Sequence, residues 1–395
     1  MKFSGIRRIF AILVGLVLMA GGLLKINDPV GTGLIVREYL NFLHLGFLRG
    51  MATVIGAFFA LLEAGTAAAL LTGVWRKGTA IITSVLLGFF TLLTLLLWIC
   101  NPEMDCGCFG EAIHLTHLQS FLKNVALLAF AAVAFIPYRN LGEPRPRKWV
   151  SFGIIAASLV VGLWFSLAHL PSVDFTPFAP NNELYASQDN DYQAQDGYEA
   201  YYIYQKGSQT GSFSLGHIPD STWTFVRVDT LLRSPFQMRE DVAMLSFSDA
   251  EGVYQDELAV LGKVAVVSVY RPEKLSERRI RRIGQFVADA ESNGVTPLIL
   301  LAGKPDVLAG SGLEDKAYMA DYKTLITLNR SNGGAVYLDD GSIVRKWSCG
   351  DLPSAKALGK TVWRDPLDST VKYLTSGRLR AQGYVLYLIA LLIFI

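Results

Sequence analysis

Three of the four cysteines lie close together at the end of a long apolar run, and thiols at this spacing can exchange disulfides. Cys106 and Cys108 are separated by a single glycine, and Cys100 lies six residues before Cys106. A Cys106–Cys108 disulfide closes a small strained ring, and strain makes a disulfide easier to exchange. Cys100 offers a less strained partner. The pattern therefore predicts a thiol–disulfide relay in which the third sulfur is free to attack.

Two other interpretations of this loop remain open. The disulfide could be a structural staple, or the loop could bind zinc or copper through two sulfurs and two ring nitrogens. The ligands of such a site would be Cys106, Cys108, His114 and His117. The segment that follows must enter the membrane, so we expect no metal here. The fourth cysteine, Cys349, is expected to be an inert or partly exposed thiol, with a link to the loop cysteines as the alternative.

The composition predicts a membrane protein that carries a polar region. Of the 395 residues, 51% are hydrophobic and 18% are charged, and the mean hydropathy is +0.34. The net charge of +2 argues against a nucleic-acid partner. A span takes about 20 apolar residues. The runs that qualify are Ile9–Leu24, Met51–Val74, Thr79–Ile99, Leu118–Ile136 and Val150–Leu170.

The basic residues indicate how these spans are oriented. They cluster around Arg8, Arg76 and Arg147, before the first, third and fifth spans. By the positive-inside rule this places the N-terminus in the cytoplasm. The first run is read as a retained helix rather than a signal peptide, because no clear cleavage site follows it. The cysteine loop and everything after the fifth span, including Cys349, then face outward, where disulfides persist.

Ionisable residues within the spans are candidates for function. Glu63 lies in the second run, and a carboxyl at that depth should face the bundle interior. It is either a proton or quinone-site ligand or the partner in a packing hydrogen bond. Lys25 and Asp28 follow the first run, where they are expected to be interfacial anchors unless they serve the site. The segment Val30–Leu48 is typical of a short interfacial helix.

The outward part begins with strands and continues as an α/β domain. Strands and a hairpin are predicted at Tyr198–Tyr204, Ser212–Leu215 and Ser221–Val228. Further on, the order of elements is typical of a thioredoxin-like domain. These elements are strand Val264–Tyr270, helix Glu273–Ser292, strand Pro297–Ala302, helix Glu314–Tyr322, strand Thr324–Leu328, and a hairpin of Ala335–Leu338 with Ser342–Trp347. The apolar tail Gly383–Ile395 is short for a span, so it either inserts partly against the bundle or belongs to a longer chain.

The first part of the chain resembles a known family. The matching residues are Lys25, Asp28-Pro29, Glu63, Asp105-Cys106-Gly107-Cys108-Phe109-Gly110, Leu115-Thr116 and Lys123-Asn124. They resemble the DoxX-like four-helix membrane proteins, and among these the MauE type of methylamine utilisation, over roughly residues 1–140. The resemblance implies redox maturation of exported proteins, by analogy with disulfide-forming membrane proteins of the vitamin K epoxide reductase type.

The outward domain resembles the thioredoxin-like domains that accompany such bundles, but it departs from them at the catalytic positions. Tyr270–Ser276 contains no thiol where the family carries Cys-x-x-Cys. The proline expected before the hairpin is replaced by Asn332-Gly-Gly-Ala. The domain is therefore predicted to keep the fold, without dithiol catalysis, as a binding or docking module.

Together these features predict a membrane α-helical protein in the bacterial inner membrane. Its parts are a DoxX/MauE-like four-helix bundle at 1–140, a connector and fifth span at 141–170, a periplasmic β-rich segment at 171–255, a thioredoxin-like α/β domain at 256–350, and a C-terminal segment at 351–395 that ends in a membrane-associated tail.

The leading hypothesis for function is thiol–disulfide exchange with a periplasmic protein, with electrons passing to a membrane quinone. Cys106 and Cys108 would be the reactive pair and Cys100 the resolving thiol, while Glu63 and Lys25 would bind the quinone or move its protons. The alternative is a non-enzymatic membrane anchor or assembly factor whose outward domain binds a partner and whose disulfide is structural.

Overall fold

The computed structural model describes most of the chain. It covers residues 2–102, 104–136, 146–185, 198–206, 209–213, 223–232, 243–308 and 310–394. The connector expected between the fourth and fifth spans lies largely outside these residues, as do Leu215 and Ser221 of the predicted strands.

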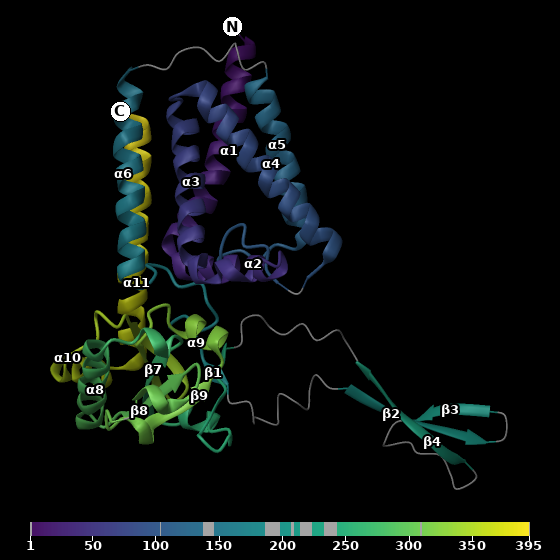
Figure 1. The fold of residues 1–395 in the computed structure, drawn as a ribbon, viewed down its shortest axis with the longest axis vertical. Coiled ribbons are helices and arrows are strands. Elements are labelled where there is room, and N and C mark those ends of the chain that lie inside the picture. Colours follow the sequence, from purple (N-terminus) through teal and green to yellow (C-terminus); the bar gives the residue numbers. More distant parts are fainter. Residues whose placement is uncertain are drawn as a thin grey trace.

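The described residues contain five helical segments that are long and apolar enough to cross a membrane, which confirms the five predicted spans. The helices are α1 (Lys2–Asn27), α3 (Ala52–Thr72), which follows the 3-10 turn η1 (Gly46–Met51), α4 (Arg76–Cys100), α5 (His117–Phe135) and α6 (Pro146–Ala168). The N-terminus of α1 lies at one end of the bundle, and the cysteine loop between α4 and α5 lies at the other (Figure 1).

Small residues bring α1 and α3 into close contact. Ala60, Ala64 and Ala67 of α3 are fully buried in the bundle core. A Cβ atom at Gly22 of α1 would come within 2.7 Å of the backbone nitrogen of Ala64. Membrane helices associate through such close packing, because lipid provides no hydrophobic drive between them. The result is a rigid frame for polar side chains of α1 and α3 near the cysteine loop.

Helix α2 (Pro29–Phe42) lies across the loop end of the bundle, in agreement with the expected interfacial helix (Figure 1). Its start follows from the sequence: the Asp28 side chain accepts a hydrogen bond from the Gly31 amide, and Pro29 occupies the first turn. The helix therefore lies directly beside the cysteine loop.

The outer domain has a six-stranded mixed sheet in the order β11-β10-β7-β8-β9-β6. Its strands are β6 (Phe247–Ser248), β7 (Lys263–Val269), β8 (Thr296–Leu301), β9 (Ala317–Ala320), β10 (Gly334–Asp339) and β11 (Ser342–Trp347). The central strands β7 and β8 are parallel and buried along nearly their whole length, as their continuous apolar sequences predict. Helices α8 (Glu277–Ser292) and α10 (Ala355–Val362) pack with one apolar cluster of the sheet, and α9 (Tyr322–Leu328) with the other.

Two predicted elements of this domain are wrong. The expected helix Glu314–Tyr322 is a short 3-10 turn followed by strand β9, and the expected strand Thr324–Leu328 belongs to helix α9. The Asp321 carboxylate accepts hydrogen bonds from the amides of the first turn of α9 and so begins that helix. A short apolar run fits the periodicity of a helix as well as that of a strand. Here the pairing of β9 with β8 decides which segment is the strand. Strand β6 also adds to the sheet a strand that lies before Val264–Tyr270, the first strand predicted for this domain.

Two smaller sheets precede this domain. Strands β1 (Leu184–Tyr185) and β5 (Ala243–Met244) form a parallel pair. Strands β2 (Tyr198–Lys206), β3 (Gln209–Phe213) and β4 (Thr224–Leu232) form an antiparallel sheet in the order β3-β2-β4, and it projects away from the other elements (Figure 1).

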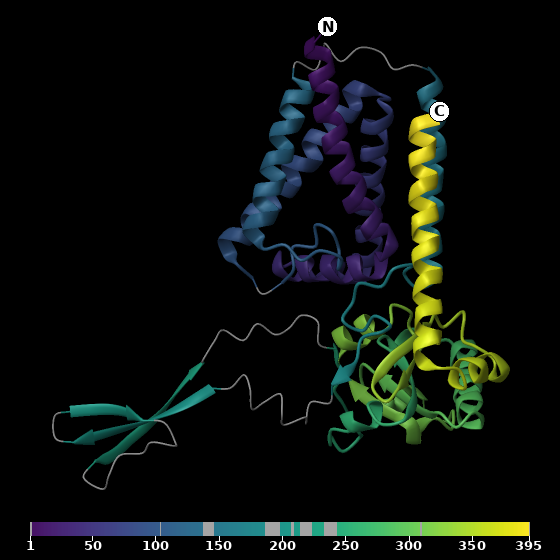
Figure 2. The same ribbon diagram turned by 180° about the vertical axis from the view of Figure 1, so that it is seen from behind.

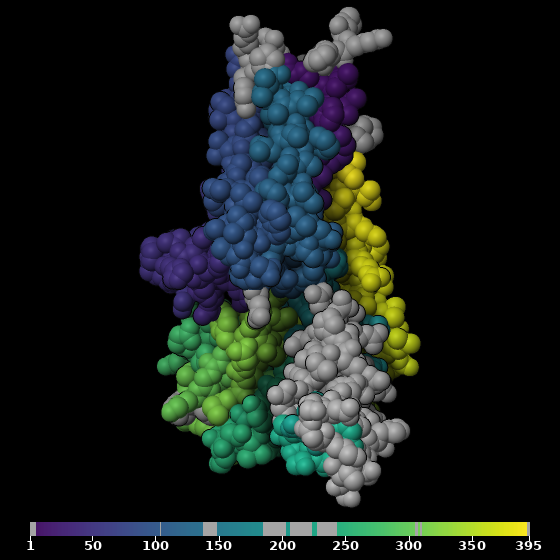
Figure 3. Space-filling view, turned by 90° about the vertical axis from the view of Figure 1, so that its right-hand side faces the viewer, coloured from purple at the N-terminus to yellow at the C-terminus, as the bar shows by residue number. Residues whose placement is uncertain are grey.

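The C-terminal helix α11 (Pro366–Phe394) returns from the outer domain and runs beside α6 (Figure 2). Ser151 of α6 donates a hydrogen bond to the carbonyl oxygen of Leu391, and the Tyr384 hydroxyl donates one to that of Ser158. The apolar tail is thus the end of a longer helix that inserts against the bundle. The space-filling view shows the α/β domain directly against the loop end of the bundle (Figure 3).

Candidate functional site

The cysteine loop is held by contacts on both of its sides. Asn101 ends α4 in a left-handed conformation, and a capping box of Thr116 and Gln119 begins α5. Between them, the Tyr39 hydroxyl of α2 donates a hydrogen bond to the carbonyl oxygen of Cys106. Gly107 has a φ of +60° and no room for a Cβ beside Ile35, so glycine is needed there. The loop therefore turns both flanking cysteines toward the bundle.

The two thiols of the loop differ in their electrostatic surroundings. The Cys106 thiol hydrogen-bonds to the Cys108 sulfur, which raises the pKa of Cys106 and is the largest cause that lowers the pKa of Cys108 to about 5. Lys123 and Lys25 lower the Cys108 pKa further. Ser120 donates a hydrogen bond to the Cys106 sulfur over 2.8 Å. Cys108 is therefore a thiolate at neutral pH and Cys106 a thiol.

A buried ion pair lies beside these sulfurs. Lys25 of α1 and Glu63 of α3 are 8% and 5% exposed, and the distance from Nζ to Oε2 is 2.5 Å. A Cβ atom at Gly21 would lie 2.6 Å from Oε1 of Glu63 and 3.3 Å from the carbonyl oxygen of Cys108, so this glycine permits the close approach. The predicted inward orientation of Glu63 is confirmed. The prediction of Lys25 as an interfacial anchor is wrong, because Glu63 provides a partner inside the bundle.

The thiols and the ion pair open onto one cavity of about 300 Å³. Its walls are largely apolar and come from α1 to α5; they include Ile55, Phe59, Phe89, Phe90 and Leu93. Its polar lining consists mainly of Lys25, Thr32, Tyr39, Glu63, Thr94, Cys106, Cys108, Lys123 and Asn124. The cavity thus places two sulfurs and two cations against a surface suited to an apolar, ring-shaped molecule.

The remaining predicted residues lie elsewhere. Cys100 is exposed at the end of α4 and does not line the cavity, and Cys349 is buried in the outer domain. The four-ligand metal alternative is not assembled: His114 faces Asp105 at 3.4 Å, and Nε2 of His117 lies 3.0 Å from the carbonyl oxygen of Pro102. Among the described residues, no group of three or more His, Cys, Asp or Glu side chains is placed to hold a metal.

The sequence interpretation missed three contributors to the site. The family resemblance includes Lys123 without a role, and the sequence pattern predicts no role for Tyr39 or Ser120. A signal existed for Lys123, because a lysine inside a membrane span needs a partner at the bundle interior. No comparable signal existed for Tyr39, whose contact with the loop depends on how α2 folds back across the bundle.

Comparison with known proteins gives a family match for the first part of the chain. The fold and the buried site define a helical membrane protein with an attached α/β domain. The family model described as Methylamine utilisation protein MauE matches residues 4–137, so this region is similar to that family. A second model, described as Domain of unknown function (DUF8463), matches residues 198–234. No curated protein and no solved structure matches the chain.

Proposed function

We propose that this protein exchanges disulfides with exported proteins through the Cys106–Cys108 pair. The observation that carries the proposal is the asymmetry of the pair: Cys108 is a thiolate held by Cys106 and two lysines, whereas Cys106 is a buried thiol. A stabilised thiolate makes the reduced form favourable and the disulfide correspondingly oxidising. An inert staple has no need of such a pair of cations.

The exchange reaction balances as follows. A thiolate of the partner attacks the Cys108 sulfur, the Cys106–Cys108 bond breaks, and Cys106 leaves with a proton. The second partner thiolate attacks its own mixed disulfide, and Cys108 leaves as the stabilised thiolate. The partner gains a disulfide and loses two electrons, which remain on the loop as the Cys106 thiol and the Cys108 thiolate. The two partner thiols lose two protons and Cys106 takes up one, so one proton is released overall. Cys100, exposed at the end of α4, is proposed as the resolving thiol.

The residues of the cavity fit a membrane quinone as the electron acceptor. Phe59, Phe89 and Phe90 offer flat apolar walls, and the ammonium groups of Lys25 and Lys123 offer donors for carbonyl oxygens. Such a quinone supplies an acceptor for two electrons and two protons. Glu63, paired with Lys25 beside the loop, is placed to hold a proton at its carboxylate.

The same proposal covers location and architecture. The loop and the outer domain lie at one end of the bundle and the N-terminus at the other (Figure 1). With the basic residues on the cytoplasmic side, the loop end is the periplasmic face of a bacterial inner membrane. The mixed sheet of the outer domain, with parallel β7 and β8 and the β10–β11 hairpin, supports a thioredoxin-like domain that has no dithiol after its first central strand.

Thiol trapping in cells tests the proposal. In Cys106→Ser the loop disulfide cannot form, but the Cys108 thiolate can still attack a disulfide of an oxidised partner, which is the reverse of the exchange above. The neighbouring thiol that would displace this partner is gone, so mixed disulfides on Cys108 should accumulate as adducts that a reductant removes. The double variant Cys106→Ser/Cys108→Ser should give no adduct at equal abundance, and Cys349→Ser should behave as the wild type. Loss of protein in both loop variants without any adduct would instead support the structural staple of an anchor or assembly factor.

A further inference from the structure

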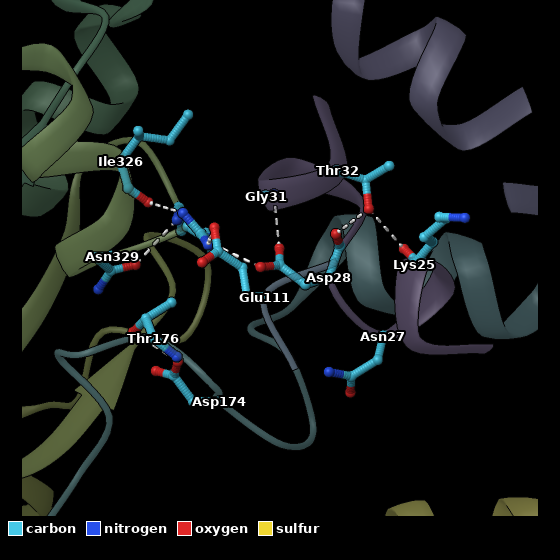
Figure 4. A network of polar contacts seen from close by, with 12 residues as sticks. Lys25, Asn27, Asp28, Gly31, Thr32, Glu111, Asp174, Thr176, Ile326 and Asn329 are labelled. Atoms are coloured by element: carbon cyan, nitrogen blue, oxygen red, sulfur yellow. Dashed lines mark hydrogen bonds and ion pairs between the residues drawn. The ribbon is translucent and has the colours of Figure 1, made fainter. Parts of the chain in front are cut away.

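One arginine of the outer domain is buried against the membrane bundle. Arg330 follows α9 and is 6% exposed. Its Nε donates to Asp28 over 2.8 Å, its Nη2 donates to Glu111 over 2.8 Å, and its Nη1 donates to the carbonyl oxygen of Ile326 over 3.0 Å (Figure 4). Each nitrogen of the guanidinium thus has an oxygen partner, and two of these partners belong to the bundle.

The two carboxylates belong to the segments that hold the cysteines. Asp28 caps α2, which carries Tyr39 on the Cys106 carbonyl and Ile35 against Gly107. Glu111 lies three residues after Cys108 in the same loop. A single guanidinium therefore connects the helix that supports the loop with the loop itself.

The outer domain holds this arginine firmly. The Tyr270 hydroxyl, at the end of β7, donates to the carbonyl oxygen of Arg330 over 3.0 Å. The Asn332 side chain bonds to the backbone of Arg271 in both directions, over 2.9 Å each. These contacts link the loop that carries Arg330 to the end of β7. The end of β7, after which no dithiol occurs, is thus the part of the domain that is linked through Arg330 to Asp28 and to the cysteine loop at Glu111.

We infer that Arg330 is a positioning residue for Cys106 and Cys108, so that the outer domain completes the thiol site of its own bundle. The inference rests on the proposed function, because it takes that pair as the reactive centre. Removing one partner of a buried ion pair costs much more stability than removing one partner of an exposed pair. Loss of Arg330 leaves the buried Asp28 and the partly buried Glu111 as neighbours of like charge, which releases both α2 and the loop.

A matched control exists at the same interface. Lys323 of α9 bonds to Glu38 of α2 over 2.7 Å, and its side chain is 66% exposed. This pair also joins the domain to α2, but it lies at the surface and its hydrogen bond is to Glu38, while the charge of Lys323 acts on Asp105 and Glu111 of the cysteine loop without a hydrogen bond. Lys323→Ala therefore tests whether any lost interdomain ion pair has the same effect as the loss of Arg330.

The experiment compares the full-length wild type with Arg330→Ala, Arg330→Lys and Lys323→Ala. The rate at which a small neutral alkylating reagent modifies Cys108 is measured against pH by mass spectrometry. The titratable groups around Cys108 are Cys106, Tyr39, Lys25, Glu63 and Lys123, and none is changed by these substitutions. Arg330→Ala should move the midpoint upward, so that the rate at pH 6 falls about tenfold. Arg330→Lys should restore part of the lost rate, and Lys323→Ala should have the pH profile of the wild type.

A folded Arg330→Ala protein with the wild-type pH profile would overturn the inference. If that variant does not fold, Gly31→Ala replaces it. The added Cβ would come too close to Oδ2 of Asp28 and would lie 2.7 Å from Nη2 of Arg330, so it disturbs the contact between these two side chains without removing charge. An unchanged profile there would also overturn the inference. A wild-type Cys108 that itself titrates at the ordinary thiol value would instead refute the proposed function, and with it this inference.

Discussion

Cys108 and Cys349 are thiols of one chain in opposite surroundings. Cys108 lies in the bundle loop, where a thiol hydrogen bond and two lysines lower its pKa to about 5. Cys349 follows β11 in the outer domain, where burial raises its pKa although Arg279 and Arg282 act in the other direction. The Cys349 amide donates a hydrogen bond to the Ser331 hydroxyl, and a Cβ atom at Gly333 would lie 3.3 Å from the Cys349 sulfur. Burial alone makes a thiol inert, and adjacent donors and cations make it reactive.

The comparison also narrows the expectation for Cys349. The sequence predicts an inert or partly exposed thiol, and the residue is buried, with 4% exposure. The domain buries its one cysteine, whereas the bundle places two lysines inside the membrane region near its pair. Since such lysines are costly, their position supports the bundle loop as the proposed site of chemistry.

The largest effect is expected from breaking the Lys25–Glu63 pair. Lys25→Met leaves a carboxylate buried in the bundle without its partner, which should cost about 3–5 kcal/mol of stability. Lys25→Met/Glu63→Gln removes both charges and should recover most of that loss. Thermal unfolding in detergent measures both variants. Equal destabilisation by the single and double variants would show that the pair does not carry this energy.

A smaller effect is expected from Lys123→Met, which removes one cation next to Cys108. The pKa of Cys108 should rise by about 1–3 units, because opposite charges in contact shift a pKa by that amount. The thiolate fraction at low pH, and therefore the alkylation rate, falls accordingly. Lys123→Arg keeps the charge and is the control. The reactivity of Cys349 should stay the same in both; a parallel change there would mean that the substitution acts through folding.

The smallest effects concern two glycines of the loop with nearly the same conformation. Gly107 and Gly110 have φ of +60° and +61°, but only Gly107 has a neighbour, Ile35, where a Cβ would lie. Gly110→Ala should cost about 1 kcal/mol from the left-handed backbone alone. Gly107→Ala should cost more, and Ile35→Ala in the same chain should relieve the difference. Equal unfolding temperatures for the two single variants would contradict the packing of α2 against the loop.

The sequence predicted those parts of the structure that depend on local pattern. The spans follow from continuous apolar runs, the thiol pair from its spacing, and the burial of Glu63 from the cost of a carboxylate in lipid. It did not predict contacts between distant segments. The Lys25–Glu63 pair joins two helices, Tyr39 reaches the loop from α2, and Arg330 meets Asp28 across 302 positions. The sequence also did not predict that β9 is a strand and α9 a helix, because this depends on the pairing of β9 with β8.

The most direct test of the central claim is the alkylation of all four cysteines of the wild type, measured in one sample across pH and resolved by mass spectrometry. A thiol with a lowered pKa is deprotonated above that value and loses its reactivity only as the pH falls through it. Cys108 should therefore react at neutral pH at its full rate, with a midpoint at about pH 5, while Cys106 and Cys349 react slowly throughout. A Cys108 midpoint at the ordinary thiol value, or a faster reaction at Cys349, would contradict the account.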